Sequence, residues 1–304
     1  MIVLVGPTAS GKTDLAVALA SALQGEIVSA DSRQVYRLLD AGTAKPSAAQ
    51  RERAKHWLLD CADPTETFDA ARWAKEAAVI IAAIRARGRI PIVCGGTGLY
   101  VRALLEGLSP LPPRNEAVRS RLAAQAESIG KAALHARLAA ADPAAAAGIP
   151  PENIQRVTRA LEVLELTGRP ISEHWSKGRS AGLSADLILR LDMTAAASRE
   201  RIEKRALSLW PGLLAEIRAL VPARFIGDEP GFTSLGYREA LACAQGKLSE
   251  GEGLAGMIRS TVAYAKRQRT WFRNQLSSTP LDTGLDASSL LSCALRAWEE
   301  AREK

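Results

Sequence analysis

Residues 6–13 read Gly-Pro-Thr-Ala-Ser-Gly-Lys-Thr and directly follow the apolar run at 2–5. The spacing is that of a phosphate-binding P-loop, which lies between a buried strand and the first turn of a helix. The two glycines let the backbone curl so that successive N–H groups point at one anion, while Lys12 adds a charge and the Thr13 hydroxyl can hold Mg²⁺. The motif therefore predicts a strand–loop–helix unit that binds a di- or triphosphate.

The composition is that of a soluble globular protein. The chain has 304 residues, of which 47% are hydrophobic and 24% charged, which suits one large domain or a core with an insertion. A formal net charge of +7 permits a polyanionic partner but also fits a basic enzyme without one. The four cysteines form no C-x-x-C pair and the three histidines form no cluster, so neither a zinc site nor a disulfide framework is expected. No apolar run could span a bilayer, and the first residues have no signal-peptide pattern, so we expect a cytoplasmic protein.

Short apolar strands alternate with helical patterns through the first hundred residues. We expect strands at 2–5, 26–29 and 90–94, and helices at 12–23 and 70–87. This alternation predicts an α/β fold, with a P-loop-type parallel sheet and helices on both faces. Ligands of such sheets bind where the strands end. The P-loop, residues 29–32 and residues 95–98 should therefore meet in one crevice, and we expect the strand before Asp31 to lie beside the P-loop strand.

The residue composition changes at a proline cluster formed by Pro110, Pro112 and Pro113. From there to residue 182 the chain is rich in Ala, Arg and Glu and has no strand candidate. We therefore predict an all-helical insertion domain over 111–182 and a catalytic core made of 1–110 and 183–304. A strand at 187–191 should resume the sheet, with helices at 197–221, 236–244 and 253–274 and a terminal helix after them.

Two polar side chains follow predicted strands in the crevice. Asp31 can coordinate Mg²⁺ or act as a general base, although an Asp-Ser pair is also a good turn or helix cap. ATPases and GTPases usually carry a metal-binding Asp after the second hydrophobic strand, but here that strand ends in Gly-Gly-Thr-Gly at 95–98. Its glycines leave N–H groups free for an anion, and Thr97 offers a hydroxyl. This favours an enzyme that holds a phosphorylated donor and transfers another group.

Residues 266–273 combine four cations with two aromatic side chains. On a helix, Arg259, Lys266 and Arg273 share one face while apolar residues line another. This pattern is typical of a helix that lies along a nucleic-acid backbone, but a solvated charged face would look the same. Residues 155–159 form a second, weaker polar and basic patch.

In combination these motifs resemble the bacterial tRNA dimethylallyltransferases, also called isopentenyl-tRNA transferases. The resemblance runs from Val3 to about Asn274 and rests on residues 6–13, 29–36, 42–46, 56–60, 95–100, 155–162, 235–238 and 266–273. One departure lies at 38–41, where Leu-Leu-Asp-Ala replaces the commoner Gly-hydrophobic-Asp-Ile and could alter a turn.

The resemblance implies that a dimethylallyl group passes from dimethylallyl diphosphate to N6 of the adenosine 3′-adjacent to the anticodon in tRNA, with release of diphosphate. The P-loop would then hold a leaving group, aided by Mg²⁺ on Thr13. Asp31 would accept the N6 proton and Thr97 would orient the amine. A small P-loop kinase is the main alternative, although it needs neither a basic C-terminal helix nor a helical insertion. The third interpretation is a non-catalytic, nucleotide-gated RNA-binding protein. The presence of Asp31 and Thr97 at strand ends in the crevice does not favour it.

The resemblance also implies which residues form the site. We expect the protein to be a monomer with no membrane partner. Catalysis is assigned to Asp31, Thr97, Lys12 and Thr13. Diphosphate binding is assigned to Gly6, Thr8, Ala9, Ser10, Gly11, Lys12, Thr13 and, as a second clamp, Arg218. Binding of the tRNA anticodon stem-loop is assigned to Asp31, Ser32, Arg33, Gln34, Thr97, Arg119, Gln155, Arg156, Val157, Thr158, Arg159, Thr233, Ser234, Leu235, Gly236, Tyr237, Arg238, Lys266, Arg267, Gln268, Arg269, Thr270, Trp271, Phe272 and Arg273.

Overall fold

The computed structural model describes residues 1–303 and divides them into two compact units. Unit 1 comprises residues 1–105 and 183–303, and unit 2 is Glu106–Gly182. Unit 2 thus begins slightly before the predicted boundary of the insertion at 111. None of the helices within residues 1–303 is both long enough and apolar enough to cross a membrane.

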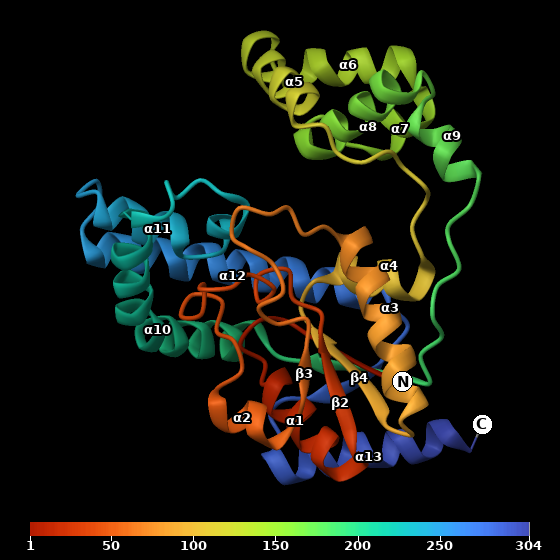
Figure 1. Ribbon diagram of the computed structural model, residues 1–304, viewed down its shortest axis with the longest axis vertical. Coiled ribbons are helices and arrows are strands. Elements are labelled where there is room, and N and C mark those ends of the chain that lie inside the picture. The colour runs from red at the N-terminus through yellow and green to blue at the C-terminus, as the bar shows by residue number, and fades with distance from the viewer. Residues whose placement is uncertain (304) are drawn as a thin grey trace. The chain divides into compact units, whose positions relative to one another are not determined.

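Six parallel strands form one sheet in unit 1 (Figure 1). Their order across the sheet is β3 (His56–Trp57), β2 (Gly25–Ser29), β4 (Ile90–Gly95), β1 (Ile2–Val5), β5 (Leu187–Asp192) and β6 (Thr279–Asp282). The predicted parallel sheet is confirmed, but β4 lies between β1 and β2. The expectation that the strand before Asp31 neighbours the P-loop strand was therefore wrong. Val5 pairs with Gly95, and Ser29 with Cys94, so these three strands still end at one edge.

Helices cover both faces of the sheet (Figure 1). On one face α1 (Lys12–Leu23) and α13 (Ala287–Arg302) share a buried apolar cluster with the strands, in which Trp298 packs near Leu189. On the other face lies α3 (Ala70–Ala86), whose Trp73 donates its indole N–H to the Ser29 carbonyl oxygen at 2.9 Å. Alternate strand residues face opposite helical layers, so a one-residue slip would exchange the side chains packed against the two layers, and the packing therefore determines the register.

Several elements were not predicted from the sequence. They are α2 (Ala48–Arg53), β3, α4 (Gly98–Glu106), the 3₁₀ turn η1 (Pro230–Thr233) and β6. The strand β6 contains Pro280, which cannot donate to a neighbouring strand. It is tolerated because β6 is the last strand of the sheet and pairs only with β5 among the described residues.

Three further helices of unit 1 pack on one another beyond the carboxyl ends of the strands (Figure 1). They are α10 (Ala195–Ala223), α11 (Tyr237–Ala244) and α12 (Glu250–Gln275). A capping box formed by Ser249 and Glu252 begins α12. These helices place side chains from the last third of the chain over the predicted crevice.

Unit 2 is built from helices and connecting loops. Its helices are α5 (Glu116–Ile129), α6 (Lys131–Ala141), α7 (Pro143–Gly148), α8 (Ile154–Thr167) and α9 (Ile171–Ser176). Leu122, Leu134, Leu138 and Leu161 meet in an apolar core that belongs to this unit alone. A core of its own allows the segment to form a separate compact unit.

Candidate active site

The P-loop lies at the end of β1 and leads into α1. Gly11 has φ +86° at the start of α1, a left-handed conformation that glycine adopts without strain. A Cβ atom on Gly6 would lie 3.0 Å from Leu191 Cβ, so a larger residue would press the loop away from β5. The glycines of the motif therefore serve both loop curvature and close packing.

The Lys12 side chain is held under the loop, where its Nζ donates to the Pro7 carbonyl oxygen at 2.6 Å. Desolvation by burial lowers the pKa of Lys12 to about 8, although the nearby Asp31 carboxylate acts to raise it. The hydroxyl of Ser10 is also buried and has no hydrogen-bond partner among the described residues. A desolvated ammonium and an unpaired hydroxyl in one loop are groups that an anion would stabilise.

Asp31 and Thr97 come together at the same edge of the sheet. The Thr97 N–H donates to the Ala30 carbonyl oxygen at 3.1 Å, and the Ser32 N–H donates to Thr97 Oγ1 at 3.0 Å. This contact is possible because residue 95 is glycine, since a Cβ there would lie 2.1 Å from the Ala30 carbonyl oxygen. Asp31 Oδ1 accepts from the Arg33 N–H at 2.9 Å, which orients the carboxylate. The structure therefore brings the predicted base and the predicted hydroxyl into one site.

Tyr264 belongs to this site but was not predicted from the sequence. It lies on α12, its side chain hydrogen-bonds to Thr97, and burial raises its pKa to about 12, with the nearby Asp31 adding to the effect. The only sequence signal is its position four residues before Gln268, on the same helical face.

Gln268 was predicted to bind tRNA, but the structure buries it between two loops. Its Oε1 accepts from the Thr8 N–H at 2.8 Å and its Nε2 donates to the Gly96 carbonyl oxygen at 2.8 Å. Phe272 is likewise buried, and Trp271 packs against Gly98. Some side chains of the segment 266–273 therefore pack inside the protein, and only the others face solvent.

The exposed part of this segment contains its cations. Lys266, Arg267 and Arg273 are exposed, as is Thr270, while Arg269 is half-buried. Arg273 Nη2 lies 3.4 Å from Asp192 Oδ1, so its charge is partly balanced within the chain. Lys266 and Arg267 are the members most accessible to a polyanion.

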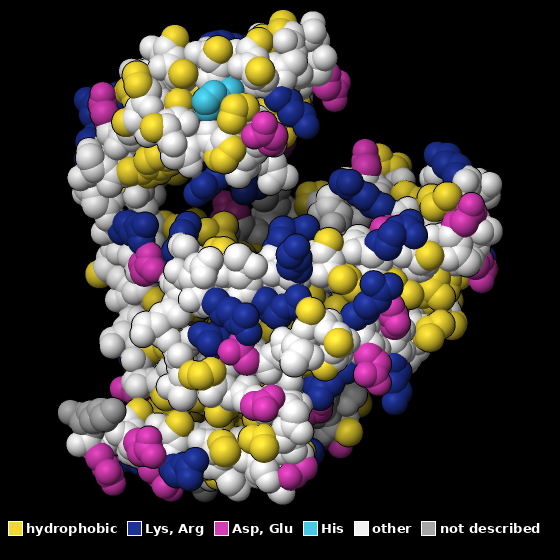
Figure 2. Space-filling view, turned by 180° about the vertical axis from the view of Figure 1, so that it is seen from behind, with side chains coloured by type: hydrophobic (Ala, Val, Ile, Leu, Met, Phe, Trp, Pro, Cys, Tyr) yellow, Lys and Arg dark blue, Asp and Glu magenta, His cyan; other side chains and the backbone are white. Residues whose placement is uncertain are grey.

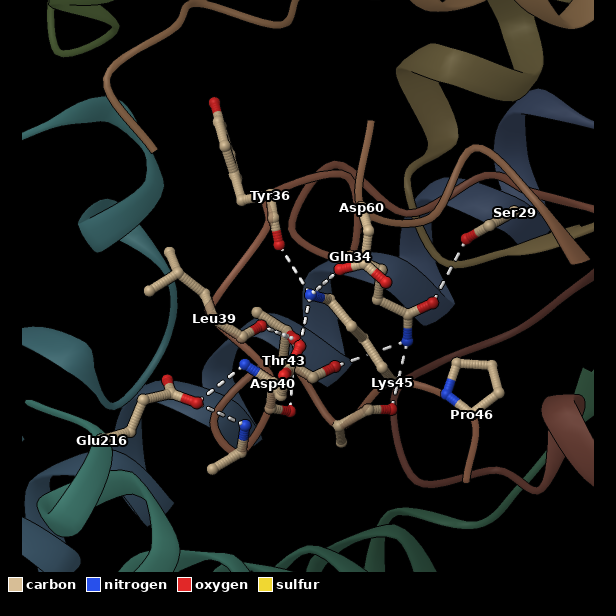
Figure 3. A network of polar contacts seen from close by, with 12 residues as sticks. Ser29, Gln34, Tyr36, Leu39, Asp40, Thr43, Lys45, Pro46, Asp60 and Glu216 are labelled. Atoms are coloured by element: carbon tan, nitrogen blue, oxygen red, sulfur yellow. Dashed lines mark hydrogen bonds and ion pairs between the residues drawn. The ribbon is translucent and has the colours of Figure 1, made fainter. Parts of the chain in front are cut away.

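A polar network holds the loop 36–46 beside the P-loop (Figure 3). Lys45 Nζ contacts the Tyr36 carbonyl oxygen and the carboxylates of Asp40 and Asp60. Gln34 accepts from the Ser29 hydroxyl at 3.2 Å and donates to the Ala44 carbonyl oxygen at 3.2 Å. Gln34, which was predicted to contact tRNA, is half-buried, and its amide holds this loop.

The same loop is held from its other side by Glu216 of α10. Its carboxylate accepts from the N–H groups of Asp40 and Ala41 at 2.8 and 2.9 Å, and from the Tyr237 hydroxyl at 2.6 Å. Burial and Glu216 together raise the pKa of the Tyr237 phenol well above its usual range. Of the segment predicted to bind tRNA at 233–238, Ser234, Gly236 and Tyr237 are therefore internal, Leu235 is half-buried, and Thr233 and Arg238 are exposed. Arg33 Nη1 donates to Thr233 Oγ1 at 2.8 Å.

A pocket adjoins the P-loop in unit 1. Its lining includes Thr8, Ala9, Thr43, Arg205, Leu209, Met257 and Thr261. The P-loop and Arg205 give it a cationic, hydrogen-bonding end, and the side chains of α10 and α12 give it an aliphatic wall. Such a division suits a ligand with an anionic head and a short apolar tail.

Arg218 does not reach this pocket. It pairs with Glu250 at 2.8 Å and lies 13 residues after Arg205 on α10, roughly 20 Å along the helix axis. Arg205 occupies the position expected for the second clamp, and burial lowers its pKa while Asp31 and Asp14 act in the opposite direction. Both arginines lie on one predicted helix, so the sequence could not show which of them lies beside the P-loop. The packing of α10 shows that it is Arg205.

In unit 2, the predicted tRNA residues fall into two classes. Arg119 and Arg159 lie 3.5 and 2.8 Å from the Glu162 carboxylate, which is fully buried. Val157 and Thr158 are buried, so they support the core of this unit. Gln155 and Arg156 are exposed and accessible to a partner.

The donor set near Thr13 fits magnesium. Within residues 1–303 no group of three or more His, Cys, Asp or Glu side chains could hold a metal ion, so a dedicated protein cage is not present in that range. Thr13 supplies a hard oxygen at the start of α1 beside the anion-binding loop. Mg²⁺ is commonly bound by one or two protein oxygens, with phosphate oxygens and water completing the shell.

Comparisons with known proteins relate the chain to one enzyme family. The family model described as IPP transferase matches residues 34–275. A tRNA dimethylallyltransferase of Anaeromyxobacter dehalogenans (strain 2CP-C) is 50% identical over 277 residues, covering 90% of this chain and 92% of that protein. A tRNA dimethylallyltransferase of Roseiflexus sp. (strain RS-1) is 43% identical over 305 residues, covering 99% of each.

Solved structures share the fold. The tRNA isopentenylpyrophosphate transferase of Bacillus halodurans superimposes with a TM-score of 0.71 at 36% identity, covering 99% of this chain and 97% of that one. A eukaryotic dimethylallyltransferase acting on tRNA gives a TM-score of 0.79 at 27% identity, covering 98% of this chain and 77% of that one.

Proposed function

The chain belongs to the IPP transferase family, and on this basis we propose that it transfers a dimethylallyl group from dimethylallyl diphosphate to tRNA. The acceptor is N6 of the adenosine 3′-adjacent to the anticodon. The observation that carries the proposal is the meeting of an anion-binding loop with Asp31 and Thr97 at one edge of the sheet. A donor diphosphate and an acceptor amine would each find suitable groups there.

On the donor side, the allylic C–O bond breaks and both electrons leave with the diphosphate. The loop amides and Lys12 are suited to stabilise the growing charge, because they are fixed before the reaction begins. Arg205 supports this assignment in place of Arg218, since it lines the same pocket as Thr8 and Ala9. When bound to Thr13, Mg²⁺ would supply further charge stabilisation to the leaving group.

On the acceptor side, the N6 nitrogen forms a bond to the allylic carbon and loses one proton. Asp31 is the candidate base, since its carboxylate is oriented by the Arg33 N–H and lies near Thr97. The Thr97 hydroxyl is a candidate partner for the amine. The adenosine sits in a loop of the tRNA, so extruding it costs only a few kcal/mol of stacking.

For tRNA binding we propose the exposed members of the predicted set. In unit 1 these are Thr233, Arg238, Lys266, Arg267, Thr270 and Arg273, and in unit 2 they are Gln155 and Arg156. Cations of this kind would contact phosphates and contribute a salt-dependent affinity. We further propose that the protein acts as a monomer in the cytoplasm.

The test supplies Mg²⁺, labelled dimethylallyl diphosphate and an anticodon stem-loop with adenosines at the modification site and beside it. We expect label at N6 of the first adenosine only. Asp31→Asn should lower the transfer rate by about 100-fold or more, with RNA affinity changed less than about threefold. The matched control is Asp228→Asn, at an exposed residue. Absence of label together with phosphate transfer from ATP to a small molecule would refute the proposal.

A further inference from the structure

Gln268 is a buried polar side chain of α12. Its amide bridges the P-loop, through the Thr8 N–H, and the turn after β4, through the Gly96 carbonyl oxygen. We propose that Gln268 is a positioning residue that sets the distance and angle between the donor loop and the acceptor-side turn. The inference rests on the proposed function, because it assigns the two loops to the two substrates.

The chemistry of the bridge requires a carboxamide. One loop presents an N–H donor and the other a carbonyl acceptor, so the bridging side chain must accept on one side and donate on the other. Both bonds are 2.8 Å long, and the side chain is only 6% exposed, so water does not compete freely for either. Among side chains of this length, the primary amide is the one that meets both demands at any pH.

The Gln268 bridge also requires glycine in the turn that follows β4. A Cβ on Gly96 would lie 2.3 Å from Gln268 Nε2, so the backbone approaches the amide as closely as a glycine allows. One turn along α12, the ring of Trp271 lies where a Cβ on Gly98 would be 2.4 Å away. Thr97, between these glycines, is therefore held on both sides by α12.

The face of α12 that reaches the site continues beyond Gln268. Thr261, Tyr264, Gln268 and Trp271 follow one another at spacings of three and four residues, which places them on one side of a helix. Thr261 lines the donor pocket and Tyr264 hydrogen-bonds to Thr97. A single rigid helix thus contacts the donor pocket, both loops and the acceptor-side hydroxyl. Displacing one loop by about 1 Å would disturb in-line transfer, for which such errors can cost on the order of 100-fold.

The test separates alignment from binding. Gln268→Met keeps the size of the side chain and removes both hydrogen bonds. We expect its single-turnover transfer rate, at saturating donor and stem-loop, to fall by about tenfold or more. The equilibrium affinities for donor and for stem-loop should each change by less than about threefold, because no contact to either is removed. Gln275→Met, at an exposed position of the same helix, is the matched control.

Gln268→Glu adds an independent readout and is interpretable even if the Met variant folds poorly. Its carboxylate can still accept from Thr8 but faces the Gly96 carbonyl oxygen, whereas its protonated form can also donate to that oxygen. Burial beside a carbonyl should raise the pKa of this carboxyl. The rate of this variant, divided by that of the unchanged chain, should therefore rise several-fold as pH falls from about 8 to about 6.

The inference is overturned if the Met variant transfers within twofold of its control, or if its loss lies wholly in substrate affinity. A pH-independent ratio for the Glu variant would also overturn it. Failure of the unchanged chain to transfer the dimethylallyl group would instead refute the proposed function, so the two failures are distinguishable.

Discussion

At the scale of single residues, Lys12 connects ligand binding to pH. Burial lowers its pKa to about 8 in the protein without a bound anion, below its ordinary value of 10.5. A diphosphate beside the ammonium favours the charged form, so binding above pH 8 must take up a proton. We expect the affinity for inorganic diphosphate to fall by up to about tenfold per pH unit between about 8 and 10.

Calorimetry in two buffers with different ionisation enthalpies measures this proton uptake directly. Lys12→Met should abolish it, whereas Lys247→Met, at an exposed lysine, should not. The same depressed pKa predicts that the free energy of unfolding, without ligand, rises as pH increases from about 8 toward 10.5, since the unfolded chain then binds more protons. Diphosphate binding without proton uptake at pH 9 would show that Lys12 is already charged or not involved.

Leu38 is strained in the folded protein. It has φ +68°, in the left-handed region, and lies at the position where the family resemblance leads us to expect glycine. A Cβ in that region costs on the order of 1–2 kcal/mol, partly offset by the greater entropy of glycine in the unfolded chain. Leu38→Gly should therefore be more stable to urea unfolding than Leu38→Ala by about 1 kcal/mol. Equal stability of these two variants would mean that the residue is not held in this conformation.

At the scale of elements, α10 determines which arginine lies beside the P-loop. Arg205 lines the pocket beside the P-loop, and Arg218 pairs with Glu250 roughly 20 Å away along the helix. Arg205→Met should weaken diphosphate binding by about ten- to a hundredfold, as expected when a charged hydrogen bond to a partly desolvated anion is lost. Arg218→Met should change it less than twofold. Titration with inorganic diphosphate distinguishes the two, and the reverse order would contradict the assignment.

The elements also show how far the sequence could be interpreted. Short apolar runs sufficed for β1 and β4, which are buried on both faces, and helical patterns with a glycine after them sufficed for α1 and α3. The strand β6 was missed because its four residues include a proline and only Leu281 is buried. The buried, site-facing side of α12 was missed for another reason. The sequence pattern identifies a basic helix, but it cannot reveal that Gln268 and Tyr264 face two loops that precede them by more than 150 residues.

The lack of three-dimensional contacts in a sequence also limited the prediction of the candidate site. Glycines, Lys12, Asp31 and Thr97 were predictable, because their roles depend on local turns and on the rule that parallel strands end at one edge. Gln34, Tyr237 and Arg119 were assigned to tRNA, and the structure gives them contacts within the protein, to Ala44, Glu216 and Glu162 respectively. Polar residues in a characteristic motif can serve either purpose, and only their partners in three dimensions distinguish the two.

At the scale of the whole molecule, the chain carries a formal net charge of +7. On the face of unit 1 drawn in Figure 2, several Lys and Arg side chains lie near one another, with Asp and Glu side chains among them. Lys266 and Arg267 are exposed on α12, the helix whose other face reaches the candidate active site. Arg296 and Arg302 are also exposed, but on α13, which packs against a face of the sheet. Charges at these two places should therefore contribute differently to RNA binding.

Charge reversal tests this difference with two double variants that change the net charge by the same amount. The double variant Lys266→Glu/Arg267→Glu should weaken binding of an anticodon stem-loop and reduce the slope of log K against log salt by about 1 to 2, because about two phosphate contacts are lost. The double variant Arg296→Glu/Arg302→Glu removes the same amount of charge from α13 and should reduce the slope far less. If both lower affinity equally, the RNA responds to the overall charge of the protein. A reduced slope only in the first variant would mean that the exposed face of α12 binds the RNA backbone, on the side of the helix away from Gln268.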